Sequence, residues 1–283
     1  MQNGGYMNVL YCGDGQAYSG LEASIYSLLT HTKYVNIFVF SMEYHRDMHN
    51  GMICVFPRVT DAQQQKLRKI VNYLDSNSHI IFIDTLQEYK DYFLQGVNED
   101  DGHSSPYAPL RLLIDIMLPE VPHVLYLDCD TIIQRDLRQM YFHYLNLIQE
   151  ANDKTCYAAF PNLIYEEEEL VRTEMVAGII LFDMTKAKQY GLLEKARYNI
   201  THYVYPWYDQ SALEAAGTYI PLDETYNYMR LYEERGDEHP AIMHFACDLN
   251  PKIYFDKKKI FYKKYPHLQY IKDGVELIDR INF

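Results

Sequence analysis

The sequence predicts an α/β fold in which helices flank a mainly parallel sheet. Short apolar runs alternate with segments that carry apolar residues at helical spacing, and turn residues separate the two. The order strand, helix, strand, helix, strand builds a parallel sheet with crossover helices. Hydrophobic residues make up 48% of the chain, enough for a sizeable core. We expect one large domain over residues 7–250 and a short, partly helical extension over 251–283.

The first half of the chain supplies the opening elements of this sheet. The apolar run at residues 7–12 (MNVLYC) ends at Gly13-Asp14-Gly15, the pattern of a buried strand followed by a tight turn. Asp61 is expected to cap the second helix. The further predicted elements are a helix over 19–30, a strand over 35–40, a helix over 61–72 and a strand over 80–83.

The second half continues the same alternation. The predicted elements are a helix over 110–118 ended by Pro119, a strand over 124–127, a helix over 136–148, and strands over 157–160 and 179–182. The polar stretch at 98–105 is expected to be a loop. The four acidic residues at 166–169 are expected to form a solvated face or a flexible loop.

Charge and cysteine usage exclude several classes of protein. The formal net charge of −13 argues against nucleic acid as a partner, although a bound cation would still permit a phosphate ligand. The five cysteines are odd in number and contain no Cys-x-x-Cys pair, so neither a disulfide framework nor a zinc site is indicated. The start of the chain lacks the pattern of a signal peptide, and no apolar stretch reaches roughly 18 residues. We therefore expect a reduced, cytoplasmic protein.

Lysines alternate with aromatic residues in the segment 252–270. This combination on an acidic protein is typical of a patch that contacts anionic lipid headgroups. It predicts peripheral contact with the inner face of a membrane. The alternative is a solvated helix whose lysines balance nearby acids.

Asp128 and Asp130 directly follow the apolar strand at 124–127 (VLYL). Open α/β sheets bind ligands at the carboxyl ends of their strands, and residues two apart in extended chain point the same way. Two carboxylates can thus hold one Mg²⁺ or Mn²⁺ that bridges two phosphates and neutralises a leaving diphosphate. The alternative is a pair of acids that merely cap a turn.

The string VLYLDCDTII also resembles the first motif of haloacid-dehalogenase-type phosphatases. In that alternative Asp128 is the nucleophile and Asp130 the general acid-base. That motif normally opens its domain, whereas here a long α/β segment precedes it. The later Gly-Asp-x-x-x-Asp motif of that family is missing.

Taken with the motifs around them, these residues make the chain similar to glycosyltransferase family 8, the retaining enzymes that include bacterial lipopolysaccharide galactosyltransferases and glycogenin. The matching segments, in order across residues 7–251, are NVLYCGD, SIYSLL, PLRLL, VLYLDCDTII, AGIILFDM, WYDQSALE and IMHF. The resemblance implies a GT-A (Rossmann-like) fold with a mixed, mainly parallel sheet. It also implies transfer of a hexose, galactose or glucose, from a UDP-sugar to a glycan, lipid-linked or protein acceptor.

The family resemblance assigns roles by position. It implies that Asp128, Asp130 and His244 hold Mn²⁺ (or Mg²⁺) and that Asp209 and Gln210 lie against the transferred sugar as the catalytic pair. The residues implied to contact the nucleotide or donor are Cys12, Asp14, Tyr18, Arg111, Cys129 and Lys252.

Three of the assigned residues have a simpler explanation from their sequence position. His244 follows an apolar run, where a histidine is often only packed. Arg111 could pair with Asp115 four residues on, and Asp209 could cap a helix.

The chain departs from the family pattern at several positions. Val176 stands where asparagine is usual, and Ala17 where a tyrosine stacks on the base, with Tyr18 adjacent. Cys247 and Asn250 replace the usual glycine and lysine, and Lys252 is displaced by two residues. These departures leave open a nucleotide-sugar-binding protein with little turnover. No acidic residue in the matched motifs is an obvious nucleophile, which favours same-face attack over a covalent intermediate.

Overall fold

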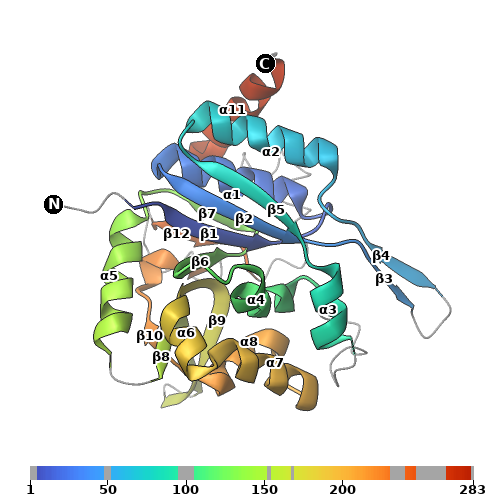
Figure 1. Ribbon diagram of the computed structural model, residues 1–283. Helices are drawn as coiled ribbons and strands as arrows, with labels where there is room; N and C mark the ends of the chain where they lie inside the picture. Colours follow the sequence, from blue (N-terminus) through green and yellow to red (C-terminus); the bar gives the residue numbers. More distant parts are fainter. Residues whose placement is uncertain are drawn as a thin grey trace.

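A seven-stranded sheet with the order β10-β8-β9-β6-β1-β2-β5 forms the centre of the molecule (Figure 1). The computed structural model describes residues 5–47, 52–94, 105–151, 154–166, 169–229, 240–246 and 266–281. The strands of this sheet are β1 (Met7–Cys12), β2 (Val35–Ser41), β5 (His79–Asp84), β6 (His123–Leu127), β8 (Thr155–Glu166), β9 (Glu169–Asp183) and β10 (Thr218–Pro221). Neighbours run parallel except at β9, which is antiparallel to β6 and β8. The predicted mixed, mainly parallel sheet is confirmed.

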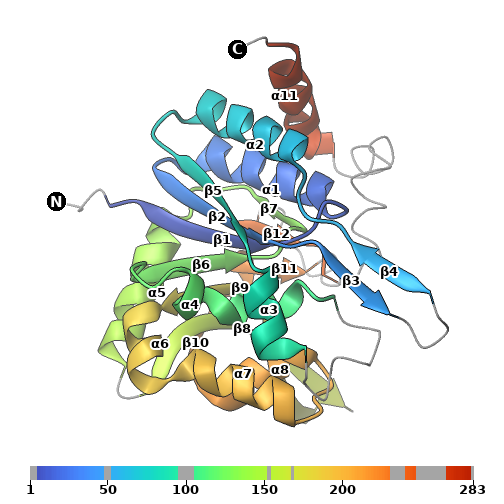
Figure 2. The same ribbon diagram turned by 45° about the vertical axis from the view of Figure 1, so that its right-hand side comes forward.

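Two smaller sheets flank the central one. The first joins β7 (Thr131–Ile133), β12 (Ile242–His244) and β11 (Tyr228–Met229), and it brings a late segment of the chain beside the end of β6. The second is a hairpin of β3 (Tyr44–Asp47) and β4 (Ile53–Phe56), which extends away from the body of the molecule (Figure 2).

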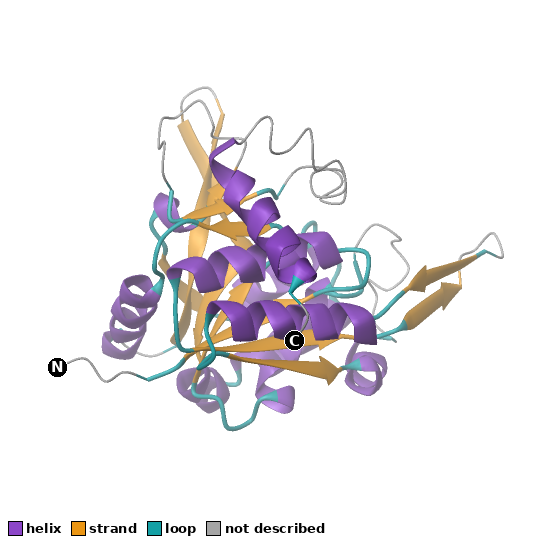
Figure 3. Ribbon diagram, turned by 90° about the horizontal axis from the view of Figure 1, so that it is seen from above, coloured by secondary structure: helices purple, strands orange, loops and turns teal. Residues whose placement is uncertain are grey.

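Helices cover both faces of the central sheet. One face carries α1 (Tyr18–His31), α2 (Asp61–Leu74), α5 (Arg138–Glu150) and α11 (Gln269–Arg280); α1, α2 and α11 lie nearest the viewer in Figure 3. The other face carries α3 (Leu86–Phe93), η2 (Ala108–Leu113), α4 (Ile114–Met117), α6 (Met184–Tyr190), α7 (Leu192–His202) and α8 (Tyr208–Ala216). Two short 3₁₀ turns, η3 (Glu224–Tyr226) and η5 (Pro266–Leu268), complete the described elements.

Strand β1 separates the two hydrophobic cores. Val9 and Tyr11 belong to the core under α1 and α2, whereas Leu10 and Cys12 belong to the core under the other helices. Successive side chains of a strand point to opposite faces, so a strand covered on both sides reads as one continuous apolar run. This explains why residues 7–12 were predictable from composition alone.

Several predicted boundaries need correction. The prediction that Asp61 caps α2 is wrong, because Thr60 is the capping residue. The Thr60 hydroxyl accepts a hydrogen bond from the Gln63 N–H, and the Gln63 side-chain oxygen accepts one from the Thr60 N–H. The helix predicted over 110–118 is instead the 3₁₀ helix η2 followed by the single turn of α4. Because Pro109 lies in the first turn of η2 and residues 109–113 are all buried, this segment has no solvent face from which a regular helix could be recognised.

The strands predicted over 157–160 and 179–182 are the apolar parts of longer elements. β8 and β9 continue as an antiparallel pair as far as Glu166 and Glu169. The acidic run lies at this connection, and its middle residues 167–168 fall outside the described part of the chain.

Helix α11 packs on α1 and α2. Lys66 of α2 joins the three helices, since its ammonium lies 2.7 Å from Glu22 of α1 and 3.0 Å from Asp279 of α11. Gly274 allows close approach, because a Cβ at this position would collide with the hydroxyl of Tyr26. The predicted C-terminal helix is confirmed, whereas most of the proposed lipid-contacting segment 252–270 lies outside the described residues. No helix in the described ranges has the length and apolar character needed to cross a membrane.

Candidate active site

The aspartate pair leaves the sheet where β6 ends. The Asp128 N–H donates to the carbonyl of Gly178 on β9 at 2.8 Å, and Thr131 donates its hydroxyl to the Asp128 carbonyl at 2.8 Å. The chain then forms β7, whose antiparallel partner β12 places His244 opposite Thr131. The Phe245 N–H donates to the Asp130 carbonyl at 3.0 Å. Two segments more than a hundred residues apart in sequence are thereby held together by backbone hydrogen bonds.

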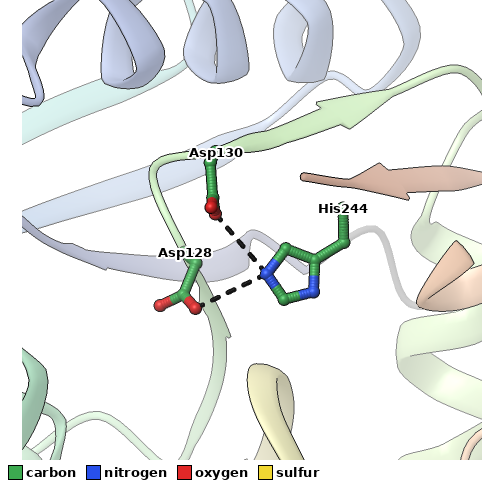
Figure 4. A group of neighbouring side chains, drawn as sticks. All are labelled: Asp128, Asp130 and His244. Atoms are coloured by element: carbon green, nitrogen blue, oxygen red, sulfur yellow. Dashed lines mark ion pairs between the residues drawn. The ribbon is translucent and has the colours of Figure 1, made fainter. Parts of the chain in front are cut away.

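Asp128, Asp130 and His244 converge on one point (Figure 4). The His244 Nε2 atom lies 3.6 Å from Asp128 Oδ2 and 3.5 Å from Asp130 Oδ1, and one ligand atom from each residue fits within 4.8 Å of the others. Ligands at about 2.1 Å from one cation lie roughly 3 Å apart, so small side-chain movements would complete such a site. The three residues predicted to be metal ligands are therefore neighbours in space.

The donor set fits a divalent cation. Among the described residues, Asp130 Oδ1 and His244 Nε2 are buried polar atoms without a hydrogen-bond partner. Unpaired buried polar atoms are costly, and a bound ion is one of the few ways to satisfy them. Two carboxylates and an imidazole suit Mn²⁺ or Mg²⁺ in the presence of phosphate oxygens.

Asn227 orients the histidine ring, and sequence reasoning missed it. Its Oδ1 lies 2.7 Å from His244 Nδ1, and both side chains are almost wholly buried. Because Asn227 Oδ1 accepts, Nδ1 carries a proton, and Nε2 is the nitrogen that faces the carboxylates and can bind a cation once it is deprotonated. No spacing rule links a residue after η3 to a histidine on β12, so only the folded structure could reveal this partner.

Gly178 makes room for the histidine. A Cβ at Gly178 would lie 2.5 Å from His244 Nε2 and 2.9 Å from Asp128 Oδ2, well inside normal contact distance. Its position on β9, directly beside the end of β6, explains why the AGIILF segment carries a glycine here.

The charges of the three residues shift one another's protonation. Burial alone would lower the pKa of His244, but the carboxylates of Asp130 and Asp128 outweigh it and raise the pKa to about 9. Burial opposes ionisation of Asp128, yet Arg111 and His244 lower its pKa to about 2. In the metal-free protein His244 is thus protonated, and its positive charge lies beside the two carboxylates that would otherwise bind a metal cation.

Arg111 joins the metal-side carboxylate to the predicted catalytic pair. Its guanidinium is buried, lies over the Tyr126 ring at 4.3 Å, and donates to the Ala177 carbonyl. Arg111 Nε is 2.8 Å from Asp209 Oδ2, and Nη1 is 3.6 Å from Asp128 Oδ1. Tyr126 also donates its hydroxyl to Asp128. These contacts hold the carboxylates of Asp128 and Asp209 in place.

The simpler explanations for Arg111 and Asp209 are wrong. Asp115 pairs with Arg197 at 2.6 Å rather than with Arg111. Trp207 occupies the N-cap position of α8, and Asp209 lies within the first turn. Burial raises the pKa of Asp209, although the Arg111 charge opposes this shift.

Gln210 is held by the backbone of β9. Its Oε1 accepts from the Ala177 N–H at 3.1 Å, and because a donor faces that branch it must be the oxygen. The Gln210 carbonyl oxygen is thus already engaged, as is the Asp209 carboxylate with Arg111.

A pocket of about 390 Å³ opens between these residues, within the size range of small-molecule sites. Asp128, His244, Arg111, Asp209 and Gln210 all line it. The structure therefore brings two of the three predicted metal ligands, Asp128 and His244, and the predicted catalytic pair to one cavity.

The residues predicted to contact the nucleotide have other partners. Asp14 Oδ1 accepts from the N–H groups of Gln16 and Ala17 before α1, and Tyr18 donates its hydroxyl to Glu22 at 2.8 Å. None of the predicted nucleotide contacts Cys12, Asp14, Tyr18 and Cys129 is among the residues that line the pocket.

Cys12, at the end of β1, and Cys129, between the two aspartates, are in contact. Cys129 donates its thiol to the Cys12 carbonyl at 3.4 Å. Burial raises the pKa of both thiols well above the usual value, so neither is a reactive thiolate. Lys252, Cys247 and Asn250 lie outside the described residues.

Comparisons with known proteins identify the family and the fold. The sequence model described as Glycosyl transferase family 8 matches residues 8–251. The structure is similar to the galactosyltransferase LgtC in complex with donor and acceptor sugar analogues (TM-score 0.60, 14% identity, 89% of this chain and 94% of that chain). It is similar to the WbbM bifunctional glycosyltransferase, with a TM-score of 0.60 and 14% sequence identity over 89% of this chain. The chain spans about half, 47%, of the length of that protein. It is also similar to mouse xyloside xylosyltransferase 1, with a TM-score of 0.57 and 13% sequence identity over 86% of this chain and 98% of that chain. Comparison with curated protein sequences finds no match.

The sheet order, the flanking helices and the similar structures define the GT-A fold of glycosyltransferases. The chain belongs to glycosyltransferase family 8, whose model covers most of its length. The phosphatase alternative for VLYLDCDTII is therefore excluded, and the family supports a role in glycosyl transfer.

Proposed function

We propose that the protein transfers a hexose, galactose or glucose, from a UDP-sugar to a glycan, lipid-linked or protein acceptor, with retention at the anomeric carbon. The observation that carries this proposal is the convergence of two carboxylates and a buried histidine nitrogen without a hydrogen-bond partner beside one pocket. Such a site suits the diphosphate of a nucleotide sugar, whereas the net charge of −13 disfavours nucleic acid.

Asp128, Asp130 and His244 would hold Mn²⁺ (or Mg²⁺). The ion, when bound, supplies positive charge that stabilises a departing diphosphate. Tyr126 and Arg111 keep the Asp128 carboxylate ionised and oriented, and Asn227 keeps the imidazole lone pair toward the site.

Asp209 and Gln210 would orient the transferred sugar rather than attack it. The Asp209 carboxylate is tied to Arg111, and the Gln210 oxygen is tied to the Ala177 N–H. The positive charge of Arg111 beside Asp209 lowers the nucleophilicity of that carboxylate, and the neutral amide of Gln210 is a weak nucleophile. This favours attack by the acceptor hydroxyl on the face from which the diphosphate leaves, with Asp209 stabilising positive charge that develops on the sugar.

One observation favours a second candidate, a nucleotide-sugar-binding protein with little turnover. Val176 lines the pocket with an apolar side chain where the family usually has asparagine. A hydroxyl of the donor sugar would then lack one hydrogen-bond partner, which weakens discrimination and orientation.

Turnover separates the two candidates. UDP-galactose and UDP-glucose are incubated with Mn²⁺ and mixed acceptors, released UDP is quantified, and the anomeric configuration of the product is determined by NMR. We expect UDP release with a retained configuration, which Asp130→Ala removes. An inverted product would contradict the same-face route, and UDP binding without release would favour the binding protein.

Three further assignments stay predictions. These are the cytoplasmic location, the peripheral membrane contact through 252–270, and the division into a catalytic domain over 7–250 with an extension over 251–283. The roles of Cys12, Asp14, Tyr18, Cys129 and Lys252 at the nucleotide also stay proposals. Their backbone and side chains would have to hold the uracil, ribose and diphosphate on the far side of the aspartate pair.

A further inference from the structure

A row of aromatic side chains, the aromatic strip, most of them exposed and Tyr205 half-buried, follows the end of α7 and its connection to α8. Its members are Tyr198, His202, Tyr203, Tyr205 and Trp207. Tyr198, Tyr203 and Trp207 are 53%, 51% and 55% exposed, and Trp207 is the only tryptophan of the chain. Large aromatic side chains carry most of the energy of many interfaces, so exposing several together indicates a binding surface.

Four of the five rings of the aromatic strip, those of Tyr198, His202, Tyr203 and Tyr205, are linked by ring contacts. Tyr198 stacks on His202 with ring centres 3.9 Å apart, and Tyr203 meets Tyr198 edge-on at 6.2 Å. Tyr205 follows at 6.4 Å from Tyr203. These contacts hold the side chains in defined orientations, which lowers the entropy cost of binding a ligand.

The aromatic strip runs between two hollows. Trp207 lines the active-site pocket together with Pro206 and Tyr208. At the other end, Tyr198 lines a second hollow of about 540 Å³ between α6 and α7, which is also lined by the polar residues Lys188, Gln189, Glu194 and Lys195. A ligand that enters the active-site pocket can therefore continue along the aromatic strip into a second, polar recess.

The backbone beside the active-site pocket is strained. Tyr208, the first residue of α8, has a φ of 46°, a conformation that L-residues other than glycine rarely adopt. Such strain persists where the surrounding structure fixes it and is concentrated at functional sites.

The composition of this surface favours carbohydrate over lipid. Residues 198–208 (YNITHYVYPWY) contain no lysine, arginine, aspartate or glutamate. Binding to anionic membranes requires clustered cations, and the chain as a whole carries a net charge of −13. Sugar rings place aliphatic C–H faces on aromatic rings while their hydroxyls bond to polar ring tips and amides, which this surface supplies.

We propose that the aromatic strip binds the acceptor beyond the sugar that receives the transfer, so that the acceptor is an oligosaccharide chain that reaches from the active-site pocket to the recess at Tyr198. This inference rests on the proposed glycosyl transfer. It predicts that affinity rises with the length of the acceptor until the aromatic strip is covered.

Trp207 itself reports on binding, because as the only tryptophan it dominates fluorescence excited where tyrosine does not absorb. The full-length protein is titrated with mono- to hexasaccharides of α- and β-linked gluco- and galacto-series, with UDP and Mn²⁺ present. We expect a change in Trp207 fluorescence whose dissociation constant falls with ligand length. Tyr203→Ala should weaken binding about three- to tenfold, and Tyr203→Phe should retain it.

Position along the aromatic strip gives a sharper test. Tyr198→Ala should weaken only the longer oligosaccharides, whereas Tyr203→Ala should weaken shorter ones as well. Tyr73→Ala is the matched control, because Tyr73 is similarly exposed (44%) but lies on α2. Equal affinity for all lengths, or a Tyr73→Ala effect as large as that of Tyr203→Ala, would overturn the proposal.

Two further outcomes are informative. A blue shift of Trp207 on phosphatidylcholine vesicles, with no response to any oligosaccharide, would overturn the carbohydrate assignment in favour of a membrane surface. UDP is titrated with Mn²⁺ into the same preparations. UDP binding without oligosaccharide binding overturns only the proposal that the aromatic strip binds the acceptor. Absence of UDP binding overturns the proposed function whatever the carbohydrate result.

Discussion

The guanidinium of Arg111 and the carboxylate of Asp209 form a buried ion pair with Nε and Oδ2 2.8 Å apart. Their residues are 6% and 5% exposed. The pair joins η2 to the first turn of α8, and the same guanidinium lies 3.6 Å from Asp128. One arginine therefore couples the placement of the predicted catalytic residue to that of the predicted metal ligand.

Removing Asp209 tests this pair. Asp209→Ala leaves the Arg111 charge buried beside Asp128 alone, so we expect a loss of about 3–5 kcal/mol in the free energy of unfolding, measured by urea denaturation. Asp209→Asn keeps the shape and should recover part of the loss without recovering transfer. Asp115→Ala is the control for breaking an ion pair outside the pocket. An Asp209→Ala change below about 0.5 kcal/mol, the size of an ordinary surface effect, would contradict the role given to the pair.

Gly178→Ala should damage the metal cluster without touching a ligand. The added methyl group would come within 2.5 Å of His244 Nε2, so the ring must move away from the carboxylates. We expect Mn²⁺ affinity, followed by electron paramagnetic resonance, to fall by at least about tenfold. Gly5→Ala serves as the control because nothing lies within 4 Å of a Cβ there. Unchanged Mn²⁺ affinity in Gly178→Ala would contradict the placement of the metal at this point.

Asn227 should raise the affinity for the metal although it is not a ligand, because it contacts the His244 nitrogen that faces away from the carboxylates. Asn227→Ala frees the imidazole to rotate and to exchange its protonated nitrogen, because the 2.7 Å bond to Nδ1 is lost. A loss of about 10- to 100-fold in Mn²⁺ affinity is expected from isothermal calorimetry. Asn227→Asp should retain more of the affinity, since a carboxylate still accepts from Nδ1. A variant that binds Mn²⁺ as tightly as the parent would remove Asn227 from the account.

Metal binding should release a proton. The metal-free protein raises the His244 pKa from 6.5 to about 9, so the imidazole is protonated at pH 7 and must lose its proton to bind a cation. Affinity for Mg²⁺, which tolerates alkaline buffers, should rise with pH up to about 9. Calorimetry in buffers of different ionisation enthalpy should show about one proton released per ion at pH 7. Release near zero would mean that His244 is already neutral.

The same shift changes the stability of the metal-free protein in a defined direction. The folded-state pKa of His244 lies above its usual 6.5, so its contribution is fully present below pH 6.5 and is lost as pH rises toward 9. Thermal unfolding in chelator between pH 6.5 and 9 should therefore show falling stability. His244→Gln, which cannot titrate, should flatten this pH profile, and an unchanged slope in that variant would assign the loss to other groups.

The strands of the parallel core could be predicted because both of their faces are buried. Residues 7–12 and 35–40 are continuous apolar runs, and β1 and β2 lie where those runs predicted. The outer parts of β8 and β9 mix polar and apolar residues and pair mainly with each other, so composition gave little signal. The structure of residues 108–117 depends on tertiary packing around Pro109 and Arg111, which no local periodicity records.

The candidate site was predictable in part for a similar reason. Asp128 and Asp130 follow a recognisable strand, and their position at its carboxyl end is a general rule of α/β sheets. His244 was predicted only through the family resemblance, because a strand of three residues has no pattern of its own. Asn227, Gly178 and the pairing of Arg111 with Asp209 depend on contacts between distant segments.

We propose that Asp128, Asp130 and His244 together hold the cation through which a UDP-sugar binds. Calorimetric titration of UDP, with and without Mn²⁺, into the parent protein and Asp130→Ala distinguishes this metal-dependent site from a metal-independent one. We predict tight UDP binding only when Mn²⁺ and Asp130 are both present. UDP binding that is equally tight without Mn²⁺, or that survives in Asp130→Ala, would contradict the claim.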